Sequence, residues 1–230
     1  MLELLGGLQE VEDAAKHLVD HYQKTYELTF TLWGDRNKTF LILLAVVGTA
    51  PLITFPALGT RSLVLLYLGH MLGLNENDLR LLQDGFPFGI LQAIILFAVL
   101  YLTINLYHRD RYVLRNYAYL SALEAEIRQT LALAAAAVAF TRESTFYWGQ
   151  RDFLAGAVRY VYIVLLAGLL FSFLSALIIA DWRSGNHLLS LVDIVFTVPT
   201  LVFVFGCARS TISIDRKHAN AAGPVHVARD

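Results

Sequence analysis

The chain has 230 residues, of which 57% are hydrophobic and only 16% are charged, and its formal net charge is -1. A water-soluble domain carries about a quarter charged residues, so this composition excludes an ordinary soluble domain. Together with long apolar runs, it predicts an all-α polytopic membrane protein. The single cysteine, Cys207, excludes an internal disulfide.

The first expected element is an amphipathic helix within residues 1–38. Its apolar side chains recur at intervals of three and four residues, as on one face of a helix: Leu4, Leu8, Val11, Ala15, Leu18, Tyr22, Tyr26, Phe30 and Trp33. This region holds seven acidic against four basic residues. Anionic lipid would repel it, so we expect the stripe to pack on protein, either on the chain's own next cytoplasmic helix or on another chain.

Four apolar segments reach the roughly 20 residues that a transmembrane helix needs. They are residues 39–58, 88–107, 160–180 and 187–207. Pro51 and Pro56 are expected to kink or end the first span. Residues 62–74 are apolar but too few to cross, and we expect a re-entrant or interfacial helix there. The short linker DWRSGN makes the last two spans an antiparallel hairpin.

Lysine and arginine are concentrated in three of the regions that lie outside the predicted spans. Four lie in the N-terminal region, seven between the second and third spans, counting Arg159 at the start of the third, and four in the tail, whereas the hairpin linker has only Arg183. Because these residues accumulate on the cytoplasmic side, both termini are predicted to face the cytoplasm, in the cell inner membrane. Trp33, Trp148 and Trp182 fall at the predicted membrane boundaries, where indole rings are enriched.

The predicted organisation has five parts. They are a cytoplasmic amphipathic helix (1–38), a first transmembrane pair (39–107), a cytoplasmic helical stalk (108–152), a second transmembrane hairpin (153–208) and a cytoplasmic tail (209–230). The tail beyond Arg216 is expected to be poorly ordered.

The stalk is expected to continue the second span as one helix to residue 140. Its seam steps alternately by four and three residues: Val113, Tyr117, Leu120, Glu124, Ile127, Leu131, Ala134 and Val138. Arg109, Arg111 and Arg115 at its root are expected to anchor the chain on lipid phosphates rather than to bind nucleic acid.

Motifs of enzymes and metal sites are not found in the sequence. It has no glycine-rich phosphate loop, GxSxG, CxxC or HExxH. His17 and His21 share a helix face in HLVDH, but no third ligand is evident, and solvated helix surface is the favoured interpretation. The sequence therefore predicts no catalytic residue, no metal site and no cofactor.

Polar residues inside the fourth span form a stripe. At 100° per residue, Ser190, Asp193, Thr197 and Thr200 share one helix face, which is expected to face helices or water rather than lipid. Gln92 of the second span lies at a similar depth to Asp193, and Arg183 is a second possible partner. Asp193 has two interpretations: a structural hydrogen bond within the protein, or a ring of carboxylates around a water-filled vestibule of an oligomer.

The layout resembles a known class of proteins. An amphipathic N-terminal helix, four spans and a long helix rooted in YHRDRYVLRNYAYLSALEAEIR are similar to small membrane proteins of bacterial phage-defence operons, such as four-helix membrane effectors and the Kiwa membrane subunit. The resemblance implies a homo-oligomer in the lipid bilayer with a soluble cytoplasmic partner. The expected function is a pore-forming or membrane-perturbing sensor or effector. The alternative is an ion channel or membrane-anchoring scaffold subunit unrelated to defence.

Overall fold

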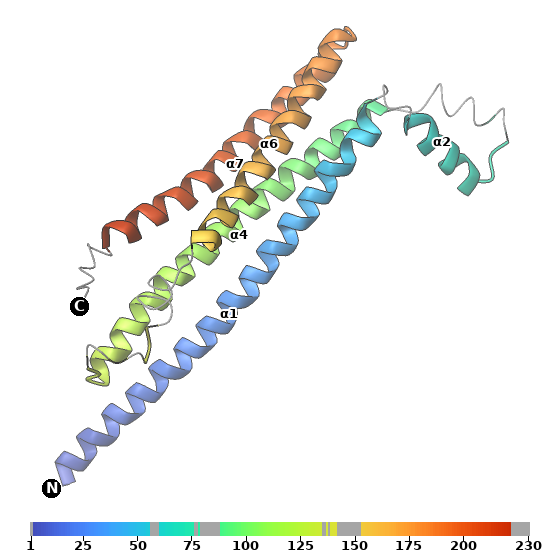
Figure 1. Ribbon diagram of the computed structural model, residues 1–230. Coiled ribbons are helices and arrows are strands. Elements are labelled where there is room, and N and C mark those ends of the chain that lie inside the picture. The colour runs from blue at the N-terminus through green and yellow to red at the C-terminus, as the bar shows by residue number, and fades with distance from the viewer. Residues whose placement is uncertain are drawn as a thin grey trace. The chain divides into compact units, whose positions relative to one another are not determined.

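The computed structural model describes residues 2–55, 60–75, 78, 88–134, 137, 139–141 and 153–221. The side chains of residues 2–12, 60–62, 64, 68, 153–159 and 210–221 lie outside the described part. The described residues form helices and turns, without any strand. The helices are α1 (Leu2–Thr54), α2 (Thr60–Met71), α4 (Phe88–Thr130), α6 (Phe153–Arg183) and α7 (His187–Ala221), as Figure 1 shows.

Four of these helices are long and apolar enough to cross a membrane. The candidate spans within the described residues are Asp13–Thr54, Phe88–Thr130, Tyr160–Arg183 and His187–Arg209. The 12 residues of α2 rise only about 18 Å, against a hydrocarbon core of about 30 Å, so α2 does not span. The described residues therefore hold four helices suited to span a membrane, as the sequence predicts, and the chain has the character of a multi-pass membrane protein.

The N-terminal helix and the first span form one element. α1 runs for 53 residues through both predicted segments, with Pro51 inside the helix. It ends at Thr54, so the first span is shorter than the predicted range to residue 58, and Pro56 lies outside the described residues. Pro51 is accommodated because it lies near the end of the helix, where the backbone N–H of Phe55 still donates to its carbonyl.

The helix α4 continues the second span as predicted, but it ends at Thr130 rather than at residue 140. Ala132 has a φ of 49°, in the left-handed region that terminates helices. Arg128 donates hydrogen bonds to the carbonyl oxygens of Ala134, Ala137 and Ala139, so its guanidinium holds the following chain in a turn. Leu131 is consequently exposed rather than part of the packed seam.

The last two helices also differ from the predicted boundaries. α6 extends to Arg183 and α7 begins at His187, so the loop of the hairpin is Ser184–Asn186, and Asp181 is helical rather than part of a linker. Gly185 adopts a φ of 75°, which this tight loop requires. α7 continues as helix to Ala221, and the poor order predicted for the chain after Arg216 stays a prediction.

The chain divides into two compact units. Unit 1 comprises Met1–Asn37, His108–Tyr160 and Arg209–Asp230, and unit 2 comprises Lys38–Tyr107 and Val161–Ala208. Unit 2 contains the apolar segments of all four spanning helices, which lie side by side (Figure 1). Their core is built from buried apolar side chains of α1, α4 and α6, with Val204 from α7: Leu43, Val47, Ala50, Leu96, Val99, Leu106, Leu166, Leu170, Phe173, Leu174, Leu177 and Val204.

Close contact between α4 and α7 depends on glycine. A Cβ atom at Gly206 would lie 3.0 Å from Cε2 of Tyr107, and one at Gly89 would lie 3.1 Å from Cδ2 of Leu189. Both contacts are tighter than ordinary van der Waals separation. The two helices therefore approach closely at both ends of their shared surface, as small residues allow in membrane bundles.

Gly206→Leu is expected to destabilise unit 2 by about 1–3 kcal/mol, because the added side chain overpacks the contact with Tyr107. Gly168→Leu is the matched control, because a Cβ atom there meets nothing within 4 Å. The melting temperatures of the two variants in detergent measure the difference. Equal melting temperatures would show that the α4–α7 contact is looser than described.

Candidate functional site

The buried face of α7 is mostly polar. Ser190, Asp193, Thr197 and Thr200 are all 6% exposed or less, and Gln92 of α4 is 4% exposed. These residues step by three and four along α7, which is the spacing of a packed helical seam. The predicted polar stripe thus faces the interior of unit 2.

Two carboxyl groups share one amide at the hairpin end of unit 2. The Nε2 atom of Gln92 donates to Oδ2 of Asp181 over 2.7 Å and to Oδ1 of Asp193 over 3.0 Å. Three helices, α4, α6 and α7, therefore meet at this amide. Each of its two N–H groups serves a different carboxyl group, and hydrogen bonds to charged acceptors are the stronger kind. We call Gln92, Asp181 and Asp193 the carboxyl–amide cluster.

Within the described part of the chain, no cationic side chain pairs with either carboxyl group of this cluster. Arg183, a partner considered from the sequence, is exposed and forms no ion pair with Asp193 among these residues. Gln92 is the amide that the sequence placed at the depth of Asp193, and its hydrogen bond agrees with the structural interpretation of that carboxylate.

Three buried oxygen atoms of the stripe have no hydrogen-bond partner among the described residues. They are Oγ of Ser190, Oδ2 of Asp193 and Oγ1 of Thr197. Thr200, by contrast, donates from Oγ1 to the carbonyl oxygen of Phe196 over 2.7 Å. Buried polar atoms in native proteins are normally satisfied by protein, water or an ion. The stripe consequently has the chemistry of a surface that binds water or cations.

Burial of Asp193 bears on the vestibule hypothesis. Asp193 is 1% exposed in a single chain. Its carboxylate therefore faces the interior of the chain's own helix bundle and does not line the central axis of an oligomer. The reason is the seam spacing that α7 shares with the other packed helices, which turns Asp193 inward together with Val204. Any hydrated space beside Asp193 therefore lies within one protomer.

Asp181 is the residue of the carboxyl–amide cluster that the sequence analysis missed, because it was placed in a linker. A usable signal was present, since a helical hairpin with a short loop brings residues at similar distances from the loop to similar depths. Asp181 lies three residues before Ser184, and Ser190 lies four residues after Asn186. Treating Asp181 as helical would have placed it beside the stripe.

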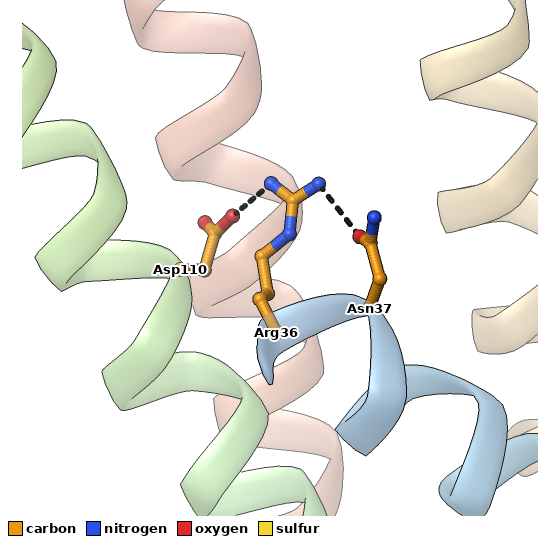
Figure 2. A network of polar contacts seen from close by, with 3 residues as sticks. All are labelled: Arg36, Asn37 and Asp110. Carbon is orange, nitrogen blue, oxygen red and sulfur yellow. Dashed lines mark hydrogen bonds and ion pairs between the residues drawn. The ribbon is translucent and has the colours of Figure 1, made fainter. Parts of the chain in front are cut away.

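Unit 1 contains a second group of polar contacts, at the root of the long helices. Figure 2 shows the guanidinium of Arg36 between two acceptors, Oδ1 of Asp110 at 3.3 Å and Oδ1 of Asn37 at 3.2 Å. Arg109 forms an ion pair with Asp35 over 3.0 Å. These contacts join α1 to α4 within unit 1.

The predicted lipid anchors differ in their surroundings. Arg109 forms an ion pair with Asp35, so Asp35 partly neutralises the positive charge of its guanidinium. Arg111 and Arg115 are exposed, as binding to lipid phosphates requires. Their role as anchors stays a prediction.

Farther along unit 1, a buried carboxylate accepts a hydrogen bond from a tyrosine. The hydroxyl of Tyr22 donates to Oε1 of Glu124 over 2.9 Å, and Glu124 is fully buried. The ring of Tyr22 also meets that of Phe140 edge-on, with centroids 5.8 Å apart. The stripe of α1 therefore packs on α4 at this point, which is the first of the two alternatives raised by the sequence.

Metal binding has no support at the histidines of α1. His21 is exposed and hydrogen-bonded to the hydroxyl of Tyr119 over 2.8 Å. In the part of the chain that the structure describes, no three His, Cys, Asp or Glu side chains are grouped in a way that could hold a metal ion.

Tyr22→Phe is expected to destabilise the contact between α1 and α4 in unit 1 by about 1.5–3 kcal/mol, because it removes a hydrogen bond to a buried charged group. Tyr119→Phe removes a bond of similar length at an exposed site and should cost about 0.5 kcal/mol or less. Amide hydrogen exchange along residues 113–127 measures the loss of protection. Similar exchange in both variants would contradict a special role for Glu124.

Searches of known protein families, of curated proteins and of solved structures find no match to this chain.

Proposed function

We propose that this chain is an oligomeric inner-membrane sensor or effector of the pore-forming or membrane-perturbing class. It works with a soluble cytoplasmic partner in bacterial phage defence. Unit 2 is the membrane element, and unit 1, on the cytoplasmic side, is the element through which a partner or a signal acts. The resemblance of the layout to defence-operon membrane proteins motivates the biological setting.

The observation that carries the proposal is the inward polar face of α7. Three buried oxygen atoms of that face have no partner among the described residues, although an apolar seam would pack more favourably inside a membrane bundle. A helix that only anchored a protein would not need this arrangement. A hydrated seam that opens or widens gives the polar face a use.

The form of unit 1 supports a regulated rather than a permanently open device. α1 and α4 have 53 and 43 residues, about twice what a bilayer requires. Their additional length forms a separate compact unit with its own buried contacts, such as that of Tyr22 with Glu124. This is more structure than insertion needs.

The proposal is tested by ion flux from liposomes that contain the purified full chain. The decisive variant combines Ser190→Ala, Thr197→Val and Thr200→Val, which removes the three hydroxyl groups of the stripe at nearly constant volume and keeps Asp193. We expect it to fold at least as stably as the natural chain but to lose flux, because water no longer wets the seam. Thr49→Val is the matched control, since Thr49 is exposed on α1 and bonds to its own backbone.

The alternatives give different results in the same assay and in a phage-plating assay. Flux that needs the stripe, together with protection against phage, supports the proposal. Flux without protection favours an ion channel unrelated to defence. Lack of flux under every activating condition, with a chain that still captures a cytoplasmic protein, favours a membrane-anchoring scaffold.

The proposed orientation places the hairpin loop outside and unit 1 in the cytoplasm. Cysteine reporters are introduced at Gly185 and at Gln129 in the Cys207→Ser background and treated with a membrane-impermeant maleimide. The reporter at Gly185 is expected to be labelled only from outside. The reporter at Gln129 is expected to be labelled only from the cytoplasm. The reason is the concentration of arginine and lysine beside residue 129 and in the tail. Labelling of Gln129 from outside would reverse the orientation.

A further inference from the structure

We infer that the carboxyl–amide cluster of Gln92, Asp181 and Asp193 binds one exchangeable monovalent cation, H⁺ or Na⁺, at the hairpin end of unit 2. The proposed function requires only that water enters the polar face of α7, whereas here one cation is assigned to the carboxyl–amide cluster. It needs only the contacts within unit 2.

The charge of the cluster is the first reason. Two carboxyl oxygens bond to the same nitrogen atom, so the distance between them is less than the sum of 2.7 and 3.0 Å. Like charges at such a separation, in surroundings of low dielectric constant, are strongly unfavourable when both groups are ionised. Gln92 is neutral, so it orients the two carboxyl groups without compensating their charge. One bound positive charge would do so.

Within the part of unit 2 that the structure describes, no basic side chain supplies this charge. Between residues 160 and 182, and again between 188 and 208, Asp181 and Asp193 are the only Asp, Glu, Lys, Arg or His residues. The segments of α1 and α4 at residues 39–54 and 88–107 contain none. The nearest basic side chains along the chain, Arg183 and His187, are exposed, and the ring of His187 packs against that of Trp182 with centroids 5.3 Å apart.

Unpartnered oxygen atoms are the second and independent reason. Oδ2 of Asp193 and Oγ of Ser190 are buried and have no hydrogen-bond partner among the described residues. Ser190 lies three residues before Asp193, so the two side chains are neighbours on the same face of α7. Oxygen atoms of carboxylate and hydroxyl groups are what a hard cation prefers, and a protonated carboxyl group would instead use its new O–H as a donor.

An entry route exists at the same end of the unit. Asp181 is partly exposed, whereas Asp193 is 1% exposed, so a cation reaches the outer carboxyl group first and the inner one next. A small ion or a proton fits this arrangement, because the described side chains leave Asp193 no direct access to bulk water. The ligand is therefore a single small cation rather than an organic molecule.

The test measures the melting temperature of the purified full chain in detergent. In one series Na⁺ replaces choline at fixed pH and ionic strength, and in the other the pH is lowered in choline alone. A ligand that binds only the folded state raises the melting temperature as its concentration increases. Asp193→Asn and Asp181→Asn each keep the size of the side chain and remove one of the two charges.

We expect the melting temperature of the natural chain to rise with Na⁺ or with acidification. Both variants should lose that response. In alkaline choline, both variants should melt at a higher temperature than the natural chain. A response to Na⁺ identifies a sodium site, and a response to pH alone identifies a proton site. Glu126→Gln, at an exposed position of α4, should respond like the natural chain. A natural chain without either response, or an unchanged response in both cluster variants, would overturn the inference.

A negative result in this experiment can be distinguished from a negative result in the flux assay. A cation-dependent melting temperature without flux would leave the site in place and remove the pore-forming function. Flux that depends on the α7 stripe, with a melting temperature that does not change with cations, would support the pore-forming function and rule out the cation site.

Discussion

Gln92→Leu is expected to destabilise the protein by about 3–5 kcal/mol, the cost of removing the partner of a buried charged group. The natural amide donates to Asp181 and to Asp193 at once. Leucine has nearly the same volume, so the cost arises from two carboxyl groups that lose their donor rather than from a cavity. Thermal unfolding in detergent, and the exchange of amide hydrogens in α6 and α7, measure it.

A second substitution should rescue the first. In the double variant Gln92→Leu with Asp193→Val, the buried acid is removed together with its donor and an apolar side chain of closer volume takes its place, while Asp181 is partly exposed and can bond to water. Replacement of a buried polar set by apolar residues of similar volume is often neutral or stabilising, so the double variant should melt near the natural temperature. An additive loss of stability in the double variant would mean that Gln92 acts through packing alone.

The matched control is Gln23→Leu. Gln23 also donates a hydrogen bond to a carboxylate, that of Glu27 over 3.1 Å, but at an exposed position of α1. Such surface interactions contribute about 0.5 kcal/mol or less. The comparison therefore separates burial from the hydrogen bond itself.

The spans and the packed faces of α4 and α7 could be predicted from the sequence because both follow from spacing, whereas Phe30 and Trp33 of the predicted α1 stripe are exposed. Apolar length specifies four spans, and steps of three and four residues specify which side of α4 is buried: Val113, Leu120, Glu124 and Ile127 all lie on that side. Ser190, Asp193, Thr197 and Thr200 were placed on one inward face for the same reason. Periodicity constrains the orientation of a helix strongly once some partner exists.

Helix ends were less accessible to this reasoning. The alanine run after Thr130 has high helical propensity, yet α4 stops there because the side chain of Arg128 bonds to three later carbonyl groups. These hydrogen bonds join residues six to eleven positions apart, and helix propensity does not reflect them. The same holds for Asp181, whose place in α6 depends on how tightly Gly185 closes the hairpin loop.

Exposed apolar side chains on α1 point to the surface that forms the proposed assembly. Leu28 and Phe30 are 55% and 65% exposed, and Phe30 stacks on Trp33 with centroids 6.2 Å apart. Thr29, by contrast, is buried, so the outer face here is more apolar than the packed one. Phe30 precedes Lys38 by eight residues, or about 12 Å of helix. Charged residues thus separate it from the hydrocarbon, and a protein surface is its natural partner.

Removal of residues 1–33 is therefore expected to leave membrane insertion intact and to abolish assembly of the chain or recruitment of its partner. The shortened α1 keeps the span that ends at Thr54, and insertion depends on that apolar length. The deletion also uncovers buried residues of α4, Val113, Leu120 and Glu124 among them, so it alone does not separate assembly from folding of unit 1. Native mass spectrometry of the detergent complex measures the oligomer.

A point variant makes that separation. Leu28→Ser with Phe30→Ser alters only exposed side chains and keeps the bond of Tyr22 to Glu124, so unit 1 should stay folded while the oligomer dissociates. His17→Ser with Lys24→Ser, at exposed polar positions of the same helix, is the matched control and should assemble normally. Because apolar contact drives association outside the membrane, loss of two large exposed apolar side chains should shift the protein from oligomer to monomer. A complex of unchanged mass in both the deletion and the point variant would show that assembly takes place through unit 2 within the bilayer.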